Sequence, residues 1–367
     1  MSNAPMLPGF EDLAPKQETQ KRGRRKRPPL TADARALVRT SAPIAVSGGT
    51  ASGAGAEELN AEQRAAVEAP IDRHCLVIAG AGSGKTKTLI SRYHFLRSAG
   101  VPARSVMTVA FNKAAATEVS QRIVKAGGAK PVLNGTFHSL GLRILHRIKD
   151  RWDLPKDIQI LEEKEIRKLV REAIQAAGAR DKIGDPKSAI GQISGWKNRG
   201  MTVDAARREV QAMPRRPQDE AWEAYRDLMA LYLGVYEAYE SAKAQLRRID
   251  FADMLLMRVV SMRADDAVRR QFAGELRHIL CDEYQDVNDC QYAFLELLAS
   301  EGARLFCVGD DFQAIYGWRH ARVEHILNFC EEHPDATRVT LVTNYRCSPE
   351  ILAVANRISQ ALSEKLE

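Results

Sequence analysis

One glycine-rich segment has residue types and a spacing that suit the binding of nucleotide phosphates. Residues 79–86 read AGAGSGKT, in which the glycines let the backbone curl so that its amide N–H groups converge on phosphate oxygens at the start of a helix. The lysine of this segment would reach the β- and γ-phosphates, and the threonine hydroxyl would ligate magnesium. Alanine stands where the strict pattern begins with glycine. We expect the nucleotide to be bound by Ala79, Gly80, Ala81, Gly82, Ser83, Gly84, Lys85, Thr86 and Lys87.

Acidic residues suited to hydrolysis occur further along the chain. A phosphate-binding loop alone holds a nucleotide without splitting it, because hydrolysis also needs a carboxylate that orients the metal and a base for the attacking water. The segment CDEYQD supplies both, since Asp282 ends an apolar run and Glu283 follows it. A pair of acids after a strand often serves only to keep the surface polar, but together with the upstream loop it predicts an ATPase. The segment VGDDFQ adds Asp310 and Gln313 at the edge of the sheet where open α/β folds bind ligands.

Continuous apolar runs predict the strands that must position these residues. They lie at residues 75–80, 106–111, 276–283, 303–310 and 339–346 and are typical of strands buried in a parallel sheet. Helices are expected over residues 85–97 and after Asn60, a polar residue that can cap a helix. Residues 140–247 read as successive amphipathic helices without a convincing strand. The simplest account is an α/β fold with a parallel sheet and an all-helical insertion.

The first 56 residues differ from the rest in composition and charge. The chain of 367 residues has a net charge of +7, and residues 1–56 hold nine Lys or Arg against four Asp or Glu. This segment is rich in Pro, Gly, Ala and Ser, contains the run KRGRRKR, and cannot bury enough apolar surface to offset its ordering entropy. We predict a disordered basic tail over residues 1–56, which either tethers the protein to nucleic-acid phosphates or acts as a solvated leader.

The sequence contains no signal for a membrane or for secretion. No stretch approaches 18 consecutive apolar residues, and the N-terminus lacks an apolar core followed by a cleavage site. Six cysteines are scattered without CxxC pairs, as expected for reduced thiols. We therefore expect a cytoplasmic protein that has no membrane partner and no disulfides, and whose only metal is the magnesium of a nucleotide.

The order of the motifs resembles one known family. LNAEQ, AGAGSGKT, VAFNKAAATEV, GTFHSL, IDFADMLL, CDEYQD, VGDDFQAIYGWRHA and VTNYR occur in this order. The series is similar to that of superfamily 1 DNA helicases of the UvrD/Rep/PcrA type, from residue 59 to about residue 360. The helical insertion also resembles that of the family through the segment SGWKN, residues 194–198.

The resemblance implies roles for individual residues of the ATP site. Gln63 would recognise adenine, Tyr345 would stack on it, and Gln313 would sense the γ-phosphate. Two arginines would stabilise the charge that develops in phosphoryl transfer, because a guanidinium matches the geometry of phosphate. The implied catalytic residues are Lys85, Glu283, Gln313, Arg319 and Arg346, and the implied magnesium ligands are Thr86 and Asp282.

The resemblance also implies DNA contacts at Phe111, Thr136, His138 and Trp318. An exposed aromatic ring can stack on any base, so Phe111 and Trp318 would hold a single strand without reading its sequence. From the local pattern alone, Phe111 fits better as a core residue that ends its strand. His320 stands where glycine is common in the family.

The implied fold is a RecA-like P-loop NTPase sheet with an all-helical inserted subdomain. We expect a first RecA-like domain over residues 57–139 and 248–335, a helical insertion over 140–247, and the start of a truncated second RecA-like domain over 336–367. The implied activity is ATP- and Mg²⁺-dependent 3′-to-5′ translocation on single-stranded or partially duplex DNA. Alone, these residues are expected to bind nucleotide with much reduced ATPase and no unwinding. The alternative is a non-unwinding module that binds ATP and DNA and takes its second half from a partner chain. Either state of assembly, monomer or oligomer, is left open.

Overall fold

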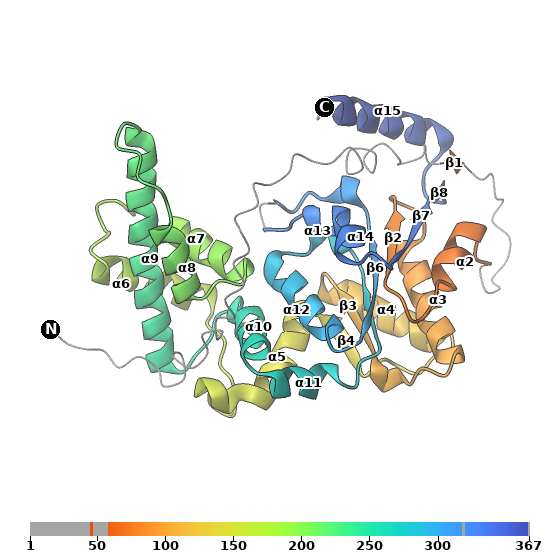
Figure 1. Cartoon of the computed structure of the whole chain (residues 1–367), viewed down its shortest axis with the longest axis horizontal. Helices are drawn as coiled ribbons and strands as arrows, with labels where there is room; N and C mark the ends of the chain where they lie inside the picture. Colours follow the sequence, from red (N-terminus) through yellow and green to blue (C-terminus); the bar gives the residue numbers. More distant parts are fainter. Residues whose placement is uncertain (1–44, 47–57, 318–319, 366–367) are drawn as a thin grey trace. The chain divides into compact units, whose positions relative to one another are not determined.

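A parallel sheet of six strands forms the centre of the fold (Figure 1). The computed structural model of the chain describes residues 45–46, 58–317 and 320–365. Each neighbouring pair in the order β4-β3-β5-β6-β2-β7 is parallel. The strands are β2 (Cys75–Ala79), β3 (Val106–Ala110), β4 (Leu133–Thr136), β5 (His278–Cys281), β6 (Arg304–Gly309) and β7 (Thr337–Leu341). The predicted α/β class with a parallel, RecA-like sheet is confirmed.

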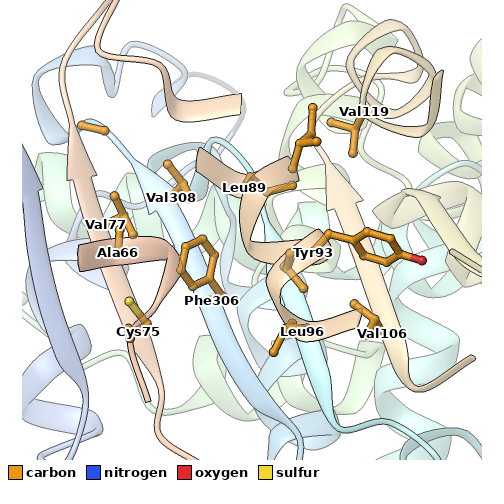
Figure 2. Packing of buried hydrophobic residues seen from close by; sticks show 14 of the residues in the cluster. Ala66, Cys75, Val77, Leu89, Tyr93, Leu96, Val106, Val119, Phe306 and Val308 are labelled. Carbon is orange, nitrogen blue, oxygen red and sulfur yellow. The ribbon is translucent and has the colours of Figure 1, made fainter. Parts of the chain in front are cut away.

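Helices pack on this sheet through apolar side chains. Helix α3 (Lys85–Ser98) places Leu89, Tyr93 and Leu96 against Val77 of β2 and Phe306 of β6, and all five are buried (Figure 2). Apolar burial of this kind is the main favourable term in folding. The other helical elements that accompany this sheet are α2 (Ala61–Val67), η1 (Ala103–Ser105), α4 (Lys113–Lys125), η3 (Tyr284–Asp286), η4 (Asp311–Gln313), α13 (Glu324–Leu327), α14 (Phe329–Glu332) and α15 (Pro349–Lys365).

The carboxyl ends of the strands bring the predicted site segments to one edge of the sheet. Strand β2 leads into the glycine-rich loop, β5 into Asp282, and β6 into Asp310. Because β6 lies between β2 and β5 in the sheet, the segment after β6 lies between the glycine-rich loop and the acidic pair. Ligands bind at this edge in open parallel sheets.

A second compact unit consists of residues 138–271 and 288–297. Its centre is an apolar cluster that includes the fully buried Trp196, stacked on Tyr236 at 5.8 Å between ring centroids. The only β-pairing among the described residues of this unit is an isolated bridge between Ile160 and Ile249. The helices that lie wholly or partly in the unit are α5 (Phe137–Ile148), η2 (Lys149–Trp152), α6 (Glu163–Ala176), α7 (Pro186–Asn198), α8 (Val203–Gln211), α9 (Glu220–Leu246), α10 (Asp253–Ala264), α11 (Asp266–Ala273) and α12 (Asp289–Ala299).

Two strands differ from the sequence-based expectation, and most of the predicted tail is outside the described residues. Strand β4 was not predicted, because its residues LNGT form no apolar run. Strand β7 pairs with β2 in the first sheet, although we expected residues 336–367 to begin a second domain. The predicted tail, residues 1–56, lies outside the described residues except for β1 (Ala45–Val46), which pairs in parallel with β8 (Thr343–Asn344).

Two further observations concern the cysteines and the helices. All six cysteines are free thiols, and four of them are buried. Within the described residues, no helix combines the length and the apolar character that crossing a membrane requires.

Candidate functional site

The glycine-rich loop has a backbone that only glycine adopts readily. Gly82 and Gly84 have φ values of 76° and 90°, in the left-handed region that a side chain disfavours. A Cβ atom on Gly82 would lie 2.5 Å from the Cβ of Arg346, and one on Gly84 would lie 2.6 Å from Nε2 of Gln63. The loop therefore packs this closely against Arg346 and Gln63 only because these two positions lack side chains.

The loop ends at the first turn of α3, which begins at Lys85. Inside the loop, both the backbone N–H and the hydroxyl of Ser83 donate to the carbonyl oxygen of Gly80, at 3.2 and 2.7 Å. Ala79 is completely buried in the core cluster, so its methyl group fills the core where the strict pattern has glycine. The free N–H groups of a helix start and its dipole favour an anion at this place.

Asp282 is buried directly after β5. Its backbone N–H donates to the carbonyl of Val109 at 3.0 Å, and its Oδ1 accepts from the N–H of Glu283 at 3.0 Å. Burial raises the pKa of Asp282 to about 6, and the charge of Glu283 adds to the rise. The nearby Thr86 side chain favours the charged form of the carboxyl and opposes this rise in pKa. A buried carboxylate beside a hydroxyl is a donor set that suits Mg²⁺, so the residues present fit the expected ion.

Glu283 lies close to the lysine of the loop. Its Oε2 atom is 3.7 Å from Nζ of Lys85, and its side chain is one-third exposed. Glu283 has a φ of 50°, a left-handed conformation that is unusual for a residue with a side chain and that concentrates at functional sites. The structure therefore brings the predicted lysine and the predicted base together.

Gln285 joins the acidic segment to the end of β6, a role that the sequence did not suggest. Its Nε2 donates to Oε2 of Glu283 at 2.8 Å, and its Oε1 accepts from the N–H of Asp310 at 2.9 Å. Asp310 in turn accepts from Nε2 of Gln313 at 2.5 Å. Gln285 is almost fully buried, so this chain of polar contacts holds Glu283 and Gln313 in fixed positions. Its place two residues after Glu283 is the only sequence signal that could have indicated it.

The residues expected to bind adenine lie on the other side of the loop. Gln63, which is buried, donates from Nε2 to the carbonyl of Ser83 at 2.9 Å. Asn60 caps α2 as predicted and also donates from Nδ2 to the hydroxyl of Tyr345 at 2.8 Å. The Tyr345 side chain is more than half exposed, and its backbone N–H donates to the carbonyl of Gly82 at 2.9 Å. Asn60 thus fixes a tyrosine whose ring face can take a base.

The structure gives fewer contacts for the other residues that are expected to bind nucleotide or DNA. Arg346 is exposed next to the loop, and its backbone N–H donates to Oδ1 of Asn344 at 2.8 Å. Nζ of Lys87 donates to the carbonyl of Glu58 at 3.2 Å. Arg319 and Trp318 lie outside the described residues.

Two aromatic pairs lie at the positions expected to contact DNA. Phe111 is half-buried after β3 and stacks on Tyr316, with ring centroids 5.2 Å apart and planes 29° apart; it is not among the buried core residues. In the other unit, His138 stacks on Phe251 at 3.9 Å and 23°, and Phe251 is 55% exposed. Thr136 is half-buried at the end of β4. Tyr316 and Phe251 were missed, although each lies within a motif that the sequence analysis had singled out.

Comparisons with known proteins agree with this geometry. A family model described as the UvrD/REP helicase N-terminal domain matches residues 59–334. DNA helicase II of Escherichia coli (strain K12) is 34% identical over 305 residues, which cover 82% of this chain and 40% of that protein. ATP-dependent DNA helicase PcrA of Staphylococcus aureus (strain Mu50) is 32% identical over 313 residues, which cover 84% of this chain and 40% of that protein. The chain thus spans 40% of the length of these relatives. From the family match and these identities together, the chain belongs to the UvrD/REP helicase family.

Proposed function

We propose that this chain binds ATP with Mg²⁺ and forms the ATP-binding part of a DNA helicase that moves 3′-to-5′ along single-stranded DNA. The observation that carries the proposal is that two pairs of side chains lie together at one edge of the sheet. Lys85 lies 3.7 Å from Glu283, and the Thr86 side chain is near enough to the buried Asp282 to favour the charged form of its carboxyl. A phosphate-binding lysine, a pair of Mg²⁺ ligands and a base are the parts that ATP hydrolysis needs.

Each side chain of the site has a distinct task in this proposal. Lys85 and the amides of the loop would hold the β- and γ-phosphates. Thr86 and Asp282 would hold the Mg²⁺ ion, which supplies positive charge to the phosphate oxygens. Glu283, exposed to solvent and aligned by Gln285, would accept the proton of the attacking water.

The positive charge that phosphoryl transfer requires would come partly from arginines. Arg346 follows the segment that is hydrogen-bonded to the loop, and Arg319 belongs to the same motif as Gln313 in sequence. Groups aimed at the developing charge contribute most when the cleft is closed around the nucleotide. We therefore expect these 367 residues to bind ATP well and to hydrolyse it slowly.

The two aromatic pairs support single-stranded DNA as the second ligand. An exposed ring stacks on any base, and such stacking tolerates any sequence. Phe111 with Tyr316 and His138 with Phe251 each present stacked rings beside a motif of the family. Two relatives are named as DNA helicases, which agrees with DNA rather than RNA as the substrate.

The test uses wild type and two variants in three assays. ATP binding is measured by fluorescence of a labelled nucleotide, hydrolysis by phosphate release with and without oligo(dT), and unwinding with a 3′-tailed duplex. Lys85→Ala should abolish nucleotide binding, because it removes the charge that holds the phosphates. Glu283→Gln should still bind ATP but release no phosphate, since an amide cannot accept a proton. Normal hydrolysis by Glu283→Gln, or normal binding by Lys85→Ala, would contradict the assignment.

A further inference from the structure

The exposed Phe251 lies at the tip of a tightly closed turn. The backbone N–H of Asp250 donates to Oδ2 of Asp253 at 2.8 Å, and the N–H of Asp253 donates to Oδ1 of Asp250 at 3.0 Å. Both aspartates are buried, whereas Phe251 is 55% exposed. The reciprocal bonds therefore direct the two carboxylates inward and leave the ring between them facing outward.

Two lysines hold this turn from the inside. Nζ of Lys197 lies 2.5 Å from Oδ2 of Asp250 and 2.6 Å from Oδ1 of Asp253. Nζ of Lys243 lies 3.1 Å from Oδ2 of Asp250 and also contacts Oδ2 of Asp253. Their side chains are only 1% and 3% exposed. Lysine is almost never buried to this extent unless it is paired, so the burial of both depends on this turn.

One further carboxylate and two tyrosines complete the surroundings. Glu240 lies 2.7 Å from Lys197 Nζ and 2.9 Å from Lys243 Nζ. The hydroxyl of Tyr239 donates to Oδ2 of Asp250 at 3.1 Å, and Lys197 lies over the ring of Tyr236 at 5.7 Å. We call the five ionisable residues the lysine–aspartate cluster: Lys197, Lys243, Glu240, Asp250 and Asp253. Among the described residues, its three carboxylates are the group close enough together to hold a metal ion, but the two ammonium groups already lie among them.

Groups of opposite charge lie side by side in the cluster. Burial favours the uncharged form of Asp250, but Lys197 and Lys243 outweigh burial and hold its pKa well below the ordinary value. Burial raises the pKa of Glu240, which favours its neutral form. The two lysines therefore lie in direct contact with the carboxyl groups that surround them.

Stability alone does not account for such a cluster. Buried ion pairs are commonly no more stabilising than apolar side chains of the same volume, because both charges must leave water. Directional contacts instead define a single geometry, and here that geometry belongs to a turn with an exposed ring at its tip. The residue after Lys197 in the SGWKN segment also makes a directional contact, since Asn198 accepts from Nδ2 of Asn288 at 3.0 Å. The SGWKN segment thus fixes its surroundings through two consecutive polar residues.

We propose that Lys197 and Lys243 are positioning residues that hold Phe251 in place as a stacking platform for a base of single-stranded DNA. This inference rests on the proposed function, because it takes single-stranded DNA as the ligand. The ring of His138 supports Phe251 from one side at 3.9 Å between centroids, and the cluster fixes the backbone on both sides of it. A ring fixed in advance loses little entropy when a base stacks on it.

The test is a double-mutant cycle in the full chain. The variants are Phe251→Ala, Lys197→Met and their combination, and the affinity for oligo(dT) is measured by fluorescence anisotropy. Phe251→Ala should weaken binding roughly 5- to 150-fold, the range that one stacked base represents. Lys197→Met should weaken it about three- to tenfold, but should add less than about twofold in the Phe251→Ala background, because coupled residues act as a unit. Quenching of a 2-aminopurine base in the oligonucleotide should fall in both single variants.

Controls separate this inference from general damage and from the proposed function. Arg207→Met, which removes a partly exposed ion pair with Glu237 in the same unit, should leave DNA affinity unchanged. If Lys197→Met does not fold by circular dichroism, Lys243→Met is taken through the same cycle. Equal losses with and without Phe251 would overturn the positioning role, as would unchanged affinity of both single variants. If either of these outcomes occurs but wild type binds ATP and oligo(dT), only the positioning role is refuted and the proposed function stands. Failure of wild type to bind oligo(dT) would refute both the positioning role and the proposed DNA binding.

Discussion

Asp282→Asn should stabilise the nucleotide-free protein while damaging its function. A rise in pKa from 3.8 to about 6 in the folded state corresponds to about 3 kcal/mol, at about 1.4 kcal/mol for each unit of pKa. The stability that protonated Asp282 contributes is fully present below about pH 3.8 and is lost as the pH rises through about 6. An amide never ionises, so the variant avoids this loss. Because asparagine keeps only part of the hydrogen bonding, we expect a net gain of about 1 to 3 kcal/mol at pH 8.

Hydrogen exchange of the amides in β2 and β5 measures this gain directly in the unit that contains the sheet. The difference between variant and wild type should be small at pH 4 and should grow up to about pH 6. Asp150→Asn, at a side chain that is 87% exposed, serves as the control and should show no such dependence. Adding Mg²⁺ with ADP should make wild type the more stable of the two proteins. A ligand stabilises the form that binds it, and the variant lacks one expected magnesium ligand. A gain that is equal at pH 4 and pH 8, or absent at both, would refute the reasoning.

Three further substitutions test separate parts of the site. Gly82→Ala should lower nucleotide affinity at least tenfold and destabilise the protein by about 1 to 3 kcal/mol, because its Cβ would lie 2.5 Å from that of Arg346; Gly100→Ala, also left-handed but in open space, should retain full nucleotide affinity in the same assay. Gln63→Leu should reduce the preference for ATP over GTP in a competition assay, since it removes the amide that donates to the loop; an unchanged preference would contradict adenine recognition. Phe111→Ala should weaken oligo(dT) binding by about 1 to 3 kcal/mol in anisotropy titrations, and unchanged affinity would remove this ring from the DNA site.

The sheet was predictable where its strands are buried on both faces. Strands β2, β3, β5 and β6 appear in the sequence as apolar runs because helices cover both sides of a parallel sheet. Strand β4 contains Asn134 and Gly135 and is a strand only because it pairs with β3, which no local pattern reveals. Likewise, the apolar character of β7 indicated a strand, but its position beside β2 depends on a pairing between distant segments.

The site was predictable to the extent that its chemistry requires fixed residue types. Binding of phosphate requires a lysine after glycines, and binding of a metal ion requires an acid after an apolar strand, so both patterns can be found in a sequence. Gln285 and Phe251 were missed because their importance lies in what they touch. His320 shows an intermediate case: its φ of 65° is the left-handed conformation for which glycine is the usual residue, which explains why glycine is common in the family there.

The contacts of the VTNYR segment connect the glycine-rich loop to helix α15. The backbone N–H of Tyr345 donates to the carbonyl of Gly82, and Nδ2 of Asn344 donates to the carbonyl of Ala81. The next side chain, Arg346, has its Cβ against Gly82, and helix α15 begins three residues later at Pro349. Because these carbonyls belong to the glycine-rich loop that is expected to hold the phosphates, we expect a change in that loop to move the segment or break its hydrogen bonds. Asn344, Tyr345 and Arg346 connect the loop to the start of α15, so we expect nucleotide binding at the loop to be transmitted along the backbone that carries Arg346.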